Sequence, residues 1–248
     1  MKLLFMGRKQ HAARALEWSV SAGFDVVGVL TDHTNRDSET ADIARRCGMP
    51  LLTLEETYEE IRSGALCFDV AVSFVYWRIL KQPLLGAARL GVLNFHPAPL
   101  PQFRGVAGYN LAILHCLEQW GVSAHYVDEG IDTGSIIDCL EFGIDPEEET
   151  AHTLESKSQE FLLTLYKKTL RKVLRGEPLA CRENVGGTYV SRAQMEEMKR
   201  ITPGDDIDRK IRAFWFPPYR GAFIEIDGQK YTLVNDFILK ELANGKKA

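Results

Sequence analysis

An asparagine and a histidine lie two residues apart at the end of a short apolar run, as Asn94 and His96. The run Gly91–Phe95 is typical of a buried strand, and alternate residues of a strand point to the same face. An amide donor and a titratable imidazole are therefore expected to project together from the strand end. Pro97 restricts the backbone of the histidine and directs the chain out of the strand. Taken alone, the pair also fits a strand–loop junction with a surface asparagine and a packed histidine.

An acidic turn that contains glycine lies between two further apolar runs, Val122–Val127 and Ile136–Leu140. Its glycines, Gly130 and Gly134, allow positive φ and a close approach of the backbone to a ligand. Asp132 is at the centre of the turn. It is either an Asx-turn residue bonded to its own backbone or the carboxylate that orients the imidazole of the first segment.

Together the two segments resemble the catalytic core of the folate-dependent formyltransferases. That family carries Asn-x-His, then a Leu-Pro-x-aromatic-basic-Gly turn, then Asp-x-Gly-x-Asp-x-Gly. The matching residues here are Asn94–His96, Leu100–Gly105 and Asp128–Gly134. The match is specific because separated motifs agree in residue type, order and spacing. A looser resemblance extends over residues 1–174 and 211–234.

The resemblance implies that Asn94, His96 and Asp132 are the catalytic residues. Formyl transfer to an amine passes through a tetrahedral oxyanion, to which Asn94 can donate a hydrogen bond. His96 can take the proton of the attacking amine, while Asp132 orients the imidazole and raises its pKa by opposite charge. No metal and no covalent enzyme intermediate are needed.

The same resemblance assigns the remaining site residues, with 10-formyltetrahydrofolate as the donor. The folate pocket is expected to comprise Phe74, Val75, Tyr76, Trp77, Asp128 and Gly130. The acceptor is expected to contact Arg8, Lys9, Arg78, Phe103 and Arg104. Alternatives stay open, because the aromatic residues can pack the sheet edge and the Arg8-Lys9 pair can form a solvated face instead of meeting a phosphate at a helix N-terminus. The family turn also implies a cis Leu100–Pro101 bond.

Length and composition agree with an ordinary soluble enzyme. The chain has 248 residues, of which 45% are hydrophobic and 26% charged, and its net charge is −4 with a pI of about 5.9. Nothing in this balance favours nucleic acid, no apolar run is long enough to span a bilayer, and the start is too short for a signal peptide. We therefore expect a cytoplasmic protein with no nucleic-acid or membrane partner. Five scattered cysteines, without a Cys-x-x-Cys pair, favour free thiols over disulfides or a metal site.

Apolar runs and amphipathic stretches alternate in the first part of the chain. Strands are predicted at Leu3–Met6, Phe24–Leu30, Leu51–Leu52, Val70–Phe74 and Gly91–Phe95, and helices over Gln10–Ser21, Glu39–Cys47, Glu55–Arg62 and Thr150–Arg175. This alternation indicates an α/β fold with a Rossmann-like, doubly wound, mostly parallel sheet as the catalytic domain, residues 1–175. Such sheets bind ligands beyond the carboxyl ends of their strands, where the Asn-x-His pair is expected.

The rest of the chain is expected to be a small extension. Residues 176–206 lack periodicity and are predicted to be a linker region. Residues 207–248 are predicted to hold a short helix at Asp208–Phe214 and a β-hairpin, Ala222–Ile226 and Gln229–Val234, around an Asp-Gly turn. An isolated hairpin is marginal in water, so this one must pack either on its own core or on a second copy of the chain. The resemblance implies the second, with the hairpin as the interface of a symmetric homodimer.

The acceptor amine is the hardest part of the function to predict. Methionyl-tRNA formyltransferases add a basic C-terminal oligonucleotide-binding domain, whereas fourteen residues follow Val234 in this sequence. A core followed by a Pro-Pro elbow and a hairpin looks most like a small nucleotide-sugar N-formyltransferase. The expected substrate is thus a dTDP- or UDP-linked amino-dideoxy sugar used for surface polysaccharide, such as lipopolysaccharide O-antigen. The alternatives are a hydroxyornithine or glycinamide ribonucleotide acceptor, or a non-catalytic folate or nucleotide-sugar binding protein.

Overall fold

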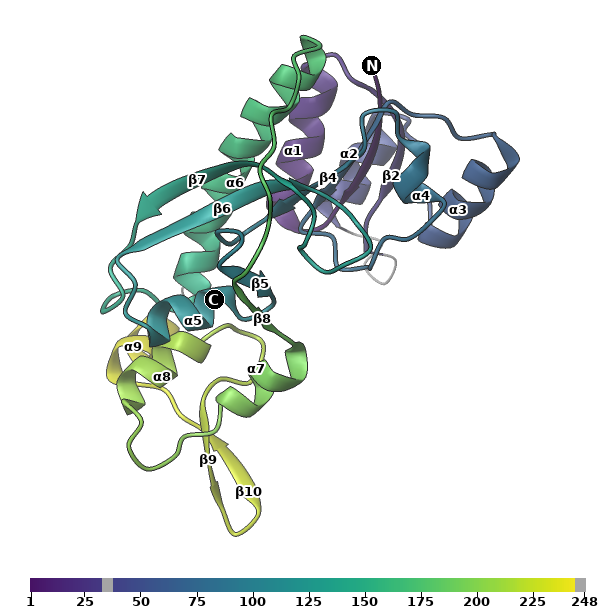
Figure 1. The fold of residues 1–248 in the computed structure, drawn as a ribbon. Helices are drawn as coiled ribbons and strands as arrows, with labels where there is room; N and C mark the ends of the chain where they lie inside the picture. The colour runs from purple at the N-terminus through teal and green to yellow at the C-terminus, as the bar shows by residue number, and fades with distance from the viewer. Residues whose placement is uncertain (33–37, 244–248) are drawn as a thin grey trace.

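The computed structural model describes residues 1–32 and 38–243, and its centre is a six-stranded sheet in the order β2-β1-β3-β4-β6-β7 (Figure 1). The strands are β1 (Lys2–Gly7), β2 (Asp25–Leu30), β3 (Val70–Phe74), β4 (Val92–His96), β6 (Gln119–Tyr126) and β7 (Ile136–Gly143). The first four are parallel to one another, and β6 and β7 extend the sheet in antiparallel fashion. The mostly parallel α/β sheet predicted from the sequence is confirmed.

Each face of the sheet buries one set of alternating side chains. In β1, Leu3 and Phe5 join one apolar cluster, while Leu4 and Met6 join the other. Three helices cover the first face, namely α1 (Lys9–Ser21), α2 (Glu39–Arg46) and α6 (Ala151–Leu174), and two cover the second, namely α3 (Leu54–Ser63) and α4 (Leu84–Ala87). Because both faces are buried, the parallel strands are nearly continuous apolar runs, as in the fully buried β3.

The long helix α6 fixes the strand that carries the Asn-x-His pair. Its Tyr166 is fully buried and meets the rings of Phe5, Phe74 and Phe95 edge-on, at centroid distances of 4.8–6.5 Å. The Tyr166 hydroxyl is within 2.6 Å of the Ser19 hydroxyl of α1, so the one polar atom of the ring is bonded inside the core. Phe95 lies between Asn94 and His96 in the strand. Because Phe95 is buried under α6, the side chains of Asn94 and His96 both point to the other face of the sheet.

A second group of elements lies at the end of the sheet where β4 stops. Helix α5 (Gly108–Leu114) packs on α8 (Ile207–Phe214), and the buried Asn110 amide donates a hydrogen bond of 2.6 Å to the carbonyl of Ala213. Arg212 is also buried, and its guanidinium bonds the carbonyls of Pro146 and Glu149. These contacts attach α8 firmly to the loop before α6. The predicted helix at Asp208–Phe214 is confirmed.

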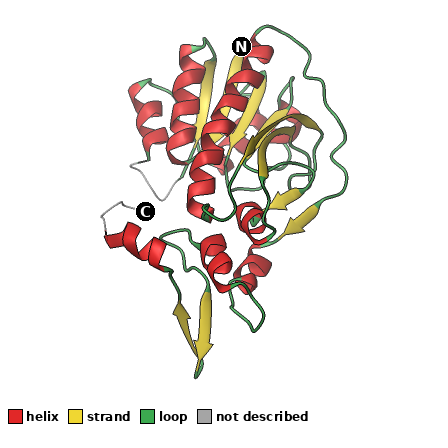
Figure 2. Cartoon of the chain, turned by 90° about the vertical axis from the view of Figure 1, so that its left-hand side faces the viewer, coloured by secondary structure: helices red, strands yellow, loops and turns green. Residues whose placement is uncertain are grey.

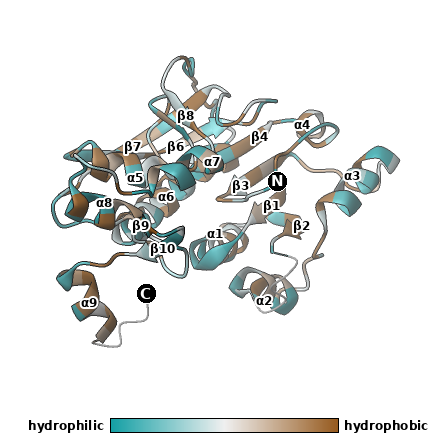
Figure 3. Ribbon diagram, turned by 90° about the horizontal axis from the view of Figure 1, so that it is seen from below, coloured by the Kyte–Doolittle hydropathy of each residue, from teal (hydrophilic) through white to brown (hydrophobic). Residues whose placement is uncertain are grey.

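The predicted C-terminal hairpin is also confirmed and projects away from the sheet (Figures 1 and 2). It consists of β9 (Phe223–Ile226) and β10 (Gln229–Thr232), and a helix that the sequence analysis did not predict, α9 (Asp236–Ala243), follows it. Phe223 at the base of β9 is buried, whereas the outer half of the hairpin is exposed. Figure 3 shows hydrophobic residues along α9 at the margin of the molecule. Residues 244–248, the end of the predicted extension, lie outside the described residues.

The stretch 176–206 does more than connect two parts of the chain. It contains β8 (Thr188–Val190), which pairs in parallel with β5 (Phe103–Gly105), and α7 (Arg192–Met198). The segment predicted to be a linker region therefore contains regular structure, which the sequence did not reveal because β8 is only three residues long and pairs with a partner far away in the sequence. A local signal for α7 was present: Ser191 and Gln194 form a capping box at its start.

Candidate active site

The Asn-x-His pair and the acidic turn meet at the carboxyl end of β4. Strand β6 runs antiparallel beside β4 and places His125 directly opposite Asn94. Asp132 follows in the turn after β6, with its Oδ1 3.6 Å from Nδ1 of His96 and 3.7 Å from Nε2 of His125. The side chains of His96 and Asp132 are 8% and 13% exposed, so this interaction occurs largely out of water. The structure thus brings the three predicted catalytic residues together, with a second histidine among them.

The backbone of the acidic turn holds Asp132 in a fixed orientation. Its φ is +54°, a left-handed conformation that aspartate adopts more readily than most residues. Its Oδ2 accepts a hydrogen bond of 3.0 Å from the N–H of Gly105, and its carbonyl accepts one of 2.9 Å from the Asn184 amide. Burial disfavours the charged carboxylate, but His96, His125 and the Gly105 N–H outweigh it, so the pKa of Asp132 lies well below its usual range. Asp132 is therefore a carboxylate at neutral pH.

His96 is in contact with two acceptors. Its Nε2 donates a hydrogen bond of 3.0 Å to the carbonyl of Phe103, because a carbonyl can only accept. Nδ1 faces Asp132, which favours uptake of a second proton there. Burial lowers the pKa of His96 more than Asp132 raises it, so the pKa is below its ordinary value. The predicted effect of the carboxylate on the pKa of His96 is confirmed, but burial, which the sequence analysis did not consider, outweighs it.

His125 is a site residue that sequence reasoning missed. Its Nδ1 donates a hydrogen bond of 2.7 Å to the carbonyl of Tyr126, which leaves Nε2 as an acceptor for the Asn94 amide at 2.9 Å. This contact fixes which way the Asn94 amide points and leaves its second N–H available. A signal was present in the sequence, because this histidine lies inside a mostly apolar strand. Its partner was not readable, since the register between β4 and β6 is a tertiary property.

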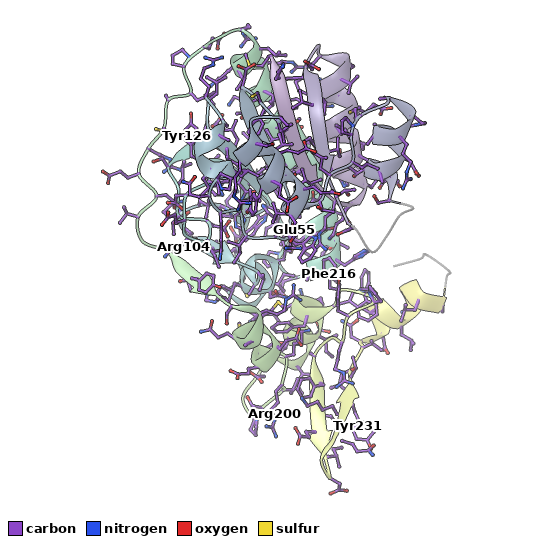
Figure 4. The ribbon with its side chains drawn as sticks, turned by 90° about the vertical axis from the view of Figure 1, so that its right-hand side faces the viewer. Glu55, Arg104, Tyr126, Arg200, Phe216 and Tyr231 are labelled. Carbon is purple, nitrogen blue, oxygen red and sulfur yellow. The ribbon has the colours of Figure 1, made fainter. Side chains whose placement is uncertain are left out.

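A cavity of about 580 Å³ opens in front of these residues. Most of the predicted site residues line it: Arg8, Lys9, Val75, Tyr76, Trp77, Arg78, Asn94, His96, Asp128, Gly130 and Asp132. Asn94, His96 and Asp132 line the same cavity as a wall formed by the loop after β3 and a wall formed by α7 and the residues that follow α8. Figure 4 shows Phe216, from that second wall, where the sheet meets the C-terminal elements.

Three predicted ligand residues do not line the cavity. Phe74 belongs to β3, is fully buried and stacks on Phe95 at 6.2 Å, because its strand position points it into the core under α6. Phe103 packs its ring on Trp120 at 5.2 Å and contributes its carbonyl to His96 instead. Arg104 follows on β5 and likewise lies outside the cavity lining. The Leu100–Pro101 bond before these residues is cis, as predicted.

The loop after β3 has the features expected of a wall for a flat, polar-edged ring. Val75 has a φ of +52°, which turns the chain sharply out of the strand. The hydroxyl of Tyr76 is buried and has no hydrogen-bond partner in the described part of the chain, and burial raises the pKa of this group to about 12. Trp77 is held by a hydrogen bond of 3.0 Å from its indole N–H to Asp32. An unsatisfied hydroxyl beside apolar surface suits a flat ligand with a polar edge.

The described residues were also compared with the patterns of a metal site and of a membrane-spanning helix. Within residues 1–32 and 38–243, no group of three or more histidine, cysteine or acidic side chains is arranged to hold a metal ion. None of the helices described is both long and apolar enough to cross a membrane.

A Rossmann-like sheet carries an amide and an imidazole at the end of β4, and a carboxylate from the turn after β6 faces the imidazole, an arrangement suited to a group-transfer enzyme. The description "Formyl transferase" matches residues 14–170, and the chain belongs to this family of enzymes that transfer one-carbon formyl groups. The folate-dependent formyltransferase resemblance seen in the sequence is confirmed.

Individual relatives come from two branches of the family. A curated methionyl-tRNA formyltransferase of Novosphingobium aromaticivorans is 31% identical over 247 residues, covering 94% of this chain and 80% of the relative. The solved N-formyltransferase of Helicobacter canadensis, in complex with folinic acid and dTDP-3-aminofucose, is 26% identical with a TM-score of 0.75, covering 93% of this chain and 86% of that one. A 4-N-formyltransferase structure from Francisella tularensis has a TM-score of 0.80 at 17% identity and covers 94% and 96%, which shows a shared fold.

Proposed function

We propose that this enzyme transfers the formyl group of 10-formyltetrahydrofolate to the primary amine of a nucleotide-linked amino-dideoxy sugar, as a step toward surface polysaccharide. The observation that carries the proposal is the set of Asn94, His96 and Asp132 at the centre of one cavity with two different walls. The Helicobacter canadensis structure supports it, because that protein was solved with folinic acid and dTDP-3-aminofucose and matches this chain over 93% of its residues.

The chemistry follows from the positions of the three side chains. Asn94 donates its free N–H to the formyl oxygen as that oxygen gains negative charge, and such a donor is worth roughly 3–4 kcal/mol in the transition state. His96 is neutral in the free enzyme and accepts the proton that the amine releases. Asp132 stabilises the resulting imidazolium across 3.6 Å. The imidazolium returns the proton to N10 of the folate as the bond between N10 and the formyl carbon breaks and tetrahydrofolate leaves, so no enzyme nucleophile is required.

Residues of the first wall would hold the folate. Val75, Tyr76 and Trp77 would face the ring system, and Asp128 and Gly130 would border it from the turn after β6. Asp128 is held in place by the Thr133 hydroxyl at 2.6 Å and the Gly130 N–H at 3.1 Å. The folate supplies an activated formyl group, and the protein supplies its orientation.

Turnover of defined amines tests the proposal. The purified protein is incubated with 10-formyltetrahydrofolate and a panel of dTDP- and UDP-linked amino sugars, and the products are identified by mass spectrometry. Formylation of at least one sugar nucleotide is expected, and the same nucleotide with a hydroxyl in place of the amine serves as control. If the panel is inert while hydroxyornithine or glycinamide ribonucleotide is formylated, the sugar part of the proposal is wrong. Folate binding without turnover of any amine would favour a non-catalytic protein.

Methionyl-tRNA is a second candidate acceptor, favoured by one specific observation. The curated relatives of 31% identity are methionyl-tRNA formyltransferases that this chain matches over most of their length. The two acceptors are distinguished by adding charged initiator tRNA at the enzyme concentration that formylates a sugar nucleotide. We expect no formyl-methionine, and its detectable formation would overturn the preference for a sugar.

A further inference from the structure

Helix α7 presents one charged face to the cavity. Arg192, Met195, Glu196 and Lys199 line the cavity, and their spacing of i, i+3, i+4 and i+7 places them on one side of a helix. Arg220 lines the same cavity from the chain that follows the Pro-Pro elbow. None of these residues was predicted to belong to the site, because residues 176–206 were expected to be a linker and Arg220 was assigned to the C-terminal extension.

The cavity carries a surplus of positive charge in a protein whose net charge is −4. Six basic residues and four carboxylates line it. Three of the basic residues are neutralised by ion pairs, Lys9–Glu155 at 3.0 Å, Arg78–Glu55 at 2.8 Å and Lys199–Glu196 at 2.7 Å. Among the described residues no carboxylate lies within ion-pair distance of Arg8, Arg192 or Arg220. Three unpaired guanidinium groups around one cavity indicate an anionic ligand.

Two of these arginines belong to a wall that is attached directly to the catalytic residues. The ring of Tyr189, three residues before Arg192, covers the α-carbon of Gly105, because a Cβ built there would lie 3.0 Å from the ring. The Gly105 N–H is in turn bonded to Asp132. At the other end of α7, the Lys199 carbonyl accepts a hydrogen bond of 3.0 Å from Phe223, three residues after Arg220. The helix and the chain after the elbow therefore form one continuous wall.

We propose that Arg192 and Arg220 bind the diphosphate of the acceptor. The proposal rests on the proposed function, since a nucleotide-linked sugar places a diphosphate beside the sugar that carries the amine. Guanidinium groups bind phosphate oxygens in bidentate fashion, and an exposed arginine without a carboxylate partner loses no ion pair when it does so. This assignment leaves the wall after β3 for the folate and makes the α7 wall the acceptor side.

The test measures nucleotide binding without turnover. Arg192→Gln and Arg220→Gln are compared with wild type by calorimetric titration with dTDP, dTMP and inorganic pyrophosphate. Arg200→Gln is the matched control, because it removes the same charge from the residue directly after Lys199. Arg200 pairs with Glu225 and does not line the cavity. Figure 4 shows Arg200 toward the hairpin, away from Phe216. Thermal unfolding of each variant without ligand verifies that it is folded.

Each cavity variant is expected to raise the Kd for dTDP and pyrophosphate about tenfold, as for loss of one hydrogen-bonded contact to a charged group. The control variant should bind dTDP as wild type does, and folinic acid should bind all variants equally. Unchanged dTDP affinity in both cavity variants overturns the proposal, as does a wild-type protein that binds neither dTDP nor pyrophosphate. If dTDP affinity falls as expected but no amino sugar is formylated, the phosphate site stands and the proposed acceptor is wrong. Equal weakening of tRNA and dTDP binding would assign the site to phosphates in general and contradict a dedicated diphosphate site.

Discussion

At the scale of single residues, His96 is placed both to accept a proton and to be stabilised once it carries the positive charge. It is buried and neutral, yet its second nitrogen faces a carboxylate that favours the protonated form. Burial keeps the imidazole free to take a proton, and Asp132 stabilises the charge once the proton arrives. The two effects oppose one another in the resting enzyme and cooperate during transfer.

Removing either functional group is expected to affect the rate more than binding. His96→Ala should lower kcat by about 10²–10⁴-fold. Asn94→Ala should lower kcat by about 10²–10³-fold with little change in KM for the acceptor, because the amide bonds an oxygen that becomes charged in the transition state. Steady-state kinetics on folded variants measure both, with His115→Ala, outside the cavity lining, as control. Near wild-type turnover by His96→Ala would contradict the assignment, and so would a pure rise in KM for Asn94→Ala.

The coupling of His96 to Asp132 has a definite sign with pH. The carboxylate raises the pKa of His96, so Asp132→Asn should move the histidine titration to lower pH. Because the pKa in the folded protein is below the ordinary value, the native state is expected to lose stability as pH falls below about 6.5, where unfolded chains take up the proton first. NMR of the labelled ring follows the titration directly and does not depend on residual activity. A titration that is unchanged in Asp132→Asn would show that the carboxylate does not act on His96.

At the scale of elements, the short β5–β8 pair organises the site. Strand β5 supplies the Phe103 carbonyl to His96 and the Gly105 N–H to Asp132, and β8 holds β5 from the other side. Gly105 has a φ of +86°, and a Cβ there would lie 2.4 Å from the carbonyl of Val190. The glycine is required both for the backbone conformation and for the approach of the two strands.

Gly105→Ala is therefore expected to separate the two strands and disturb both catalytic partners. We expect kcat/KM to fall about 10²-fold, as when reacting groups are displaced by about 1 Å. Gly176→Ala is the control, since Gly176 also has a positive φ, of +68°, but a Cβ there would meet nothing within 4 Å. That variant should lose about 1 kcal/mol of stability and keep its activity. Equal activity of the two variants would show that the close approach at Gly105 is not needed.

The same elements show what the sequence can and cannot predict. Asn94, His96 and Asp132 were predictable because each lies in a local pattern with its own spacing, and the parallel sheet followed from alternating runs. Long apolar strands and the hairpin turn were likewise local features. His125 was missed because its role depends on the register of β6 against β4. Helix α7 was missed because its start is stabilised locally but its position depends on β8, which pairs with a strand about 85 residues earlier.

At the scale of the whole molecule, the projecting hairpin and α9 expose apolar side chains that nothing in the described chain covers. Ile226 and Tyr231 on the hairpin are 52% and 49% exposed, and Phe237 and Leu239 on α9 are 51% and 54% exposed. Such a concentration of exposed apolar residues marks an association surface in soluble proteins. We propose, as the family resemblance suggested, that this surface forms a two-fold homodimer.

The dimer is tested by light scattering of the full-length protein and of the double variant Ile226→Asp with Tyr231→Asp. We expect a dimer for the unmodified protein and a folded monomer for the variant, because buried unpaired carboxylates are costly at an interface. Val185→Asp, at a 73% exposed position outside the hairpin, is the control and should stay dimeric. A monomeric unmodified protein would refute the dimer, and a dimeric double variant would place the interface elsewhere.

The pairing of β5 with β8 also has a consequence for how the protein is made. A ribosome adds about 5–20 residues per second, so on the order of 10 s separates the synthesis of Gly105 from that of Val190. The nascent chain can bury much of its sheet during that interval, while the carbonyl and amide that orient the catalytic pair still lack their supporting strand. A chain under synthesis is therefore expected to become compact before it becomes active. A chain that terminates between these two points would have much of its sheet folded but would not transfer a formyl group.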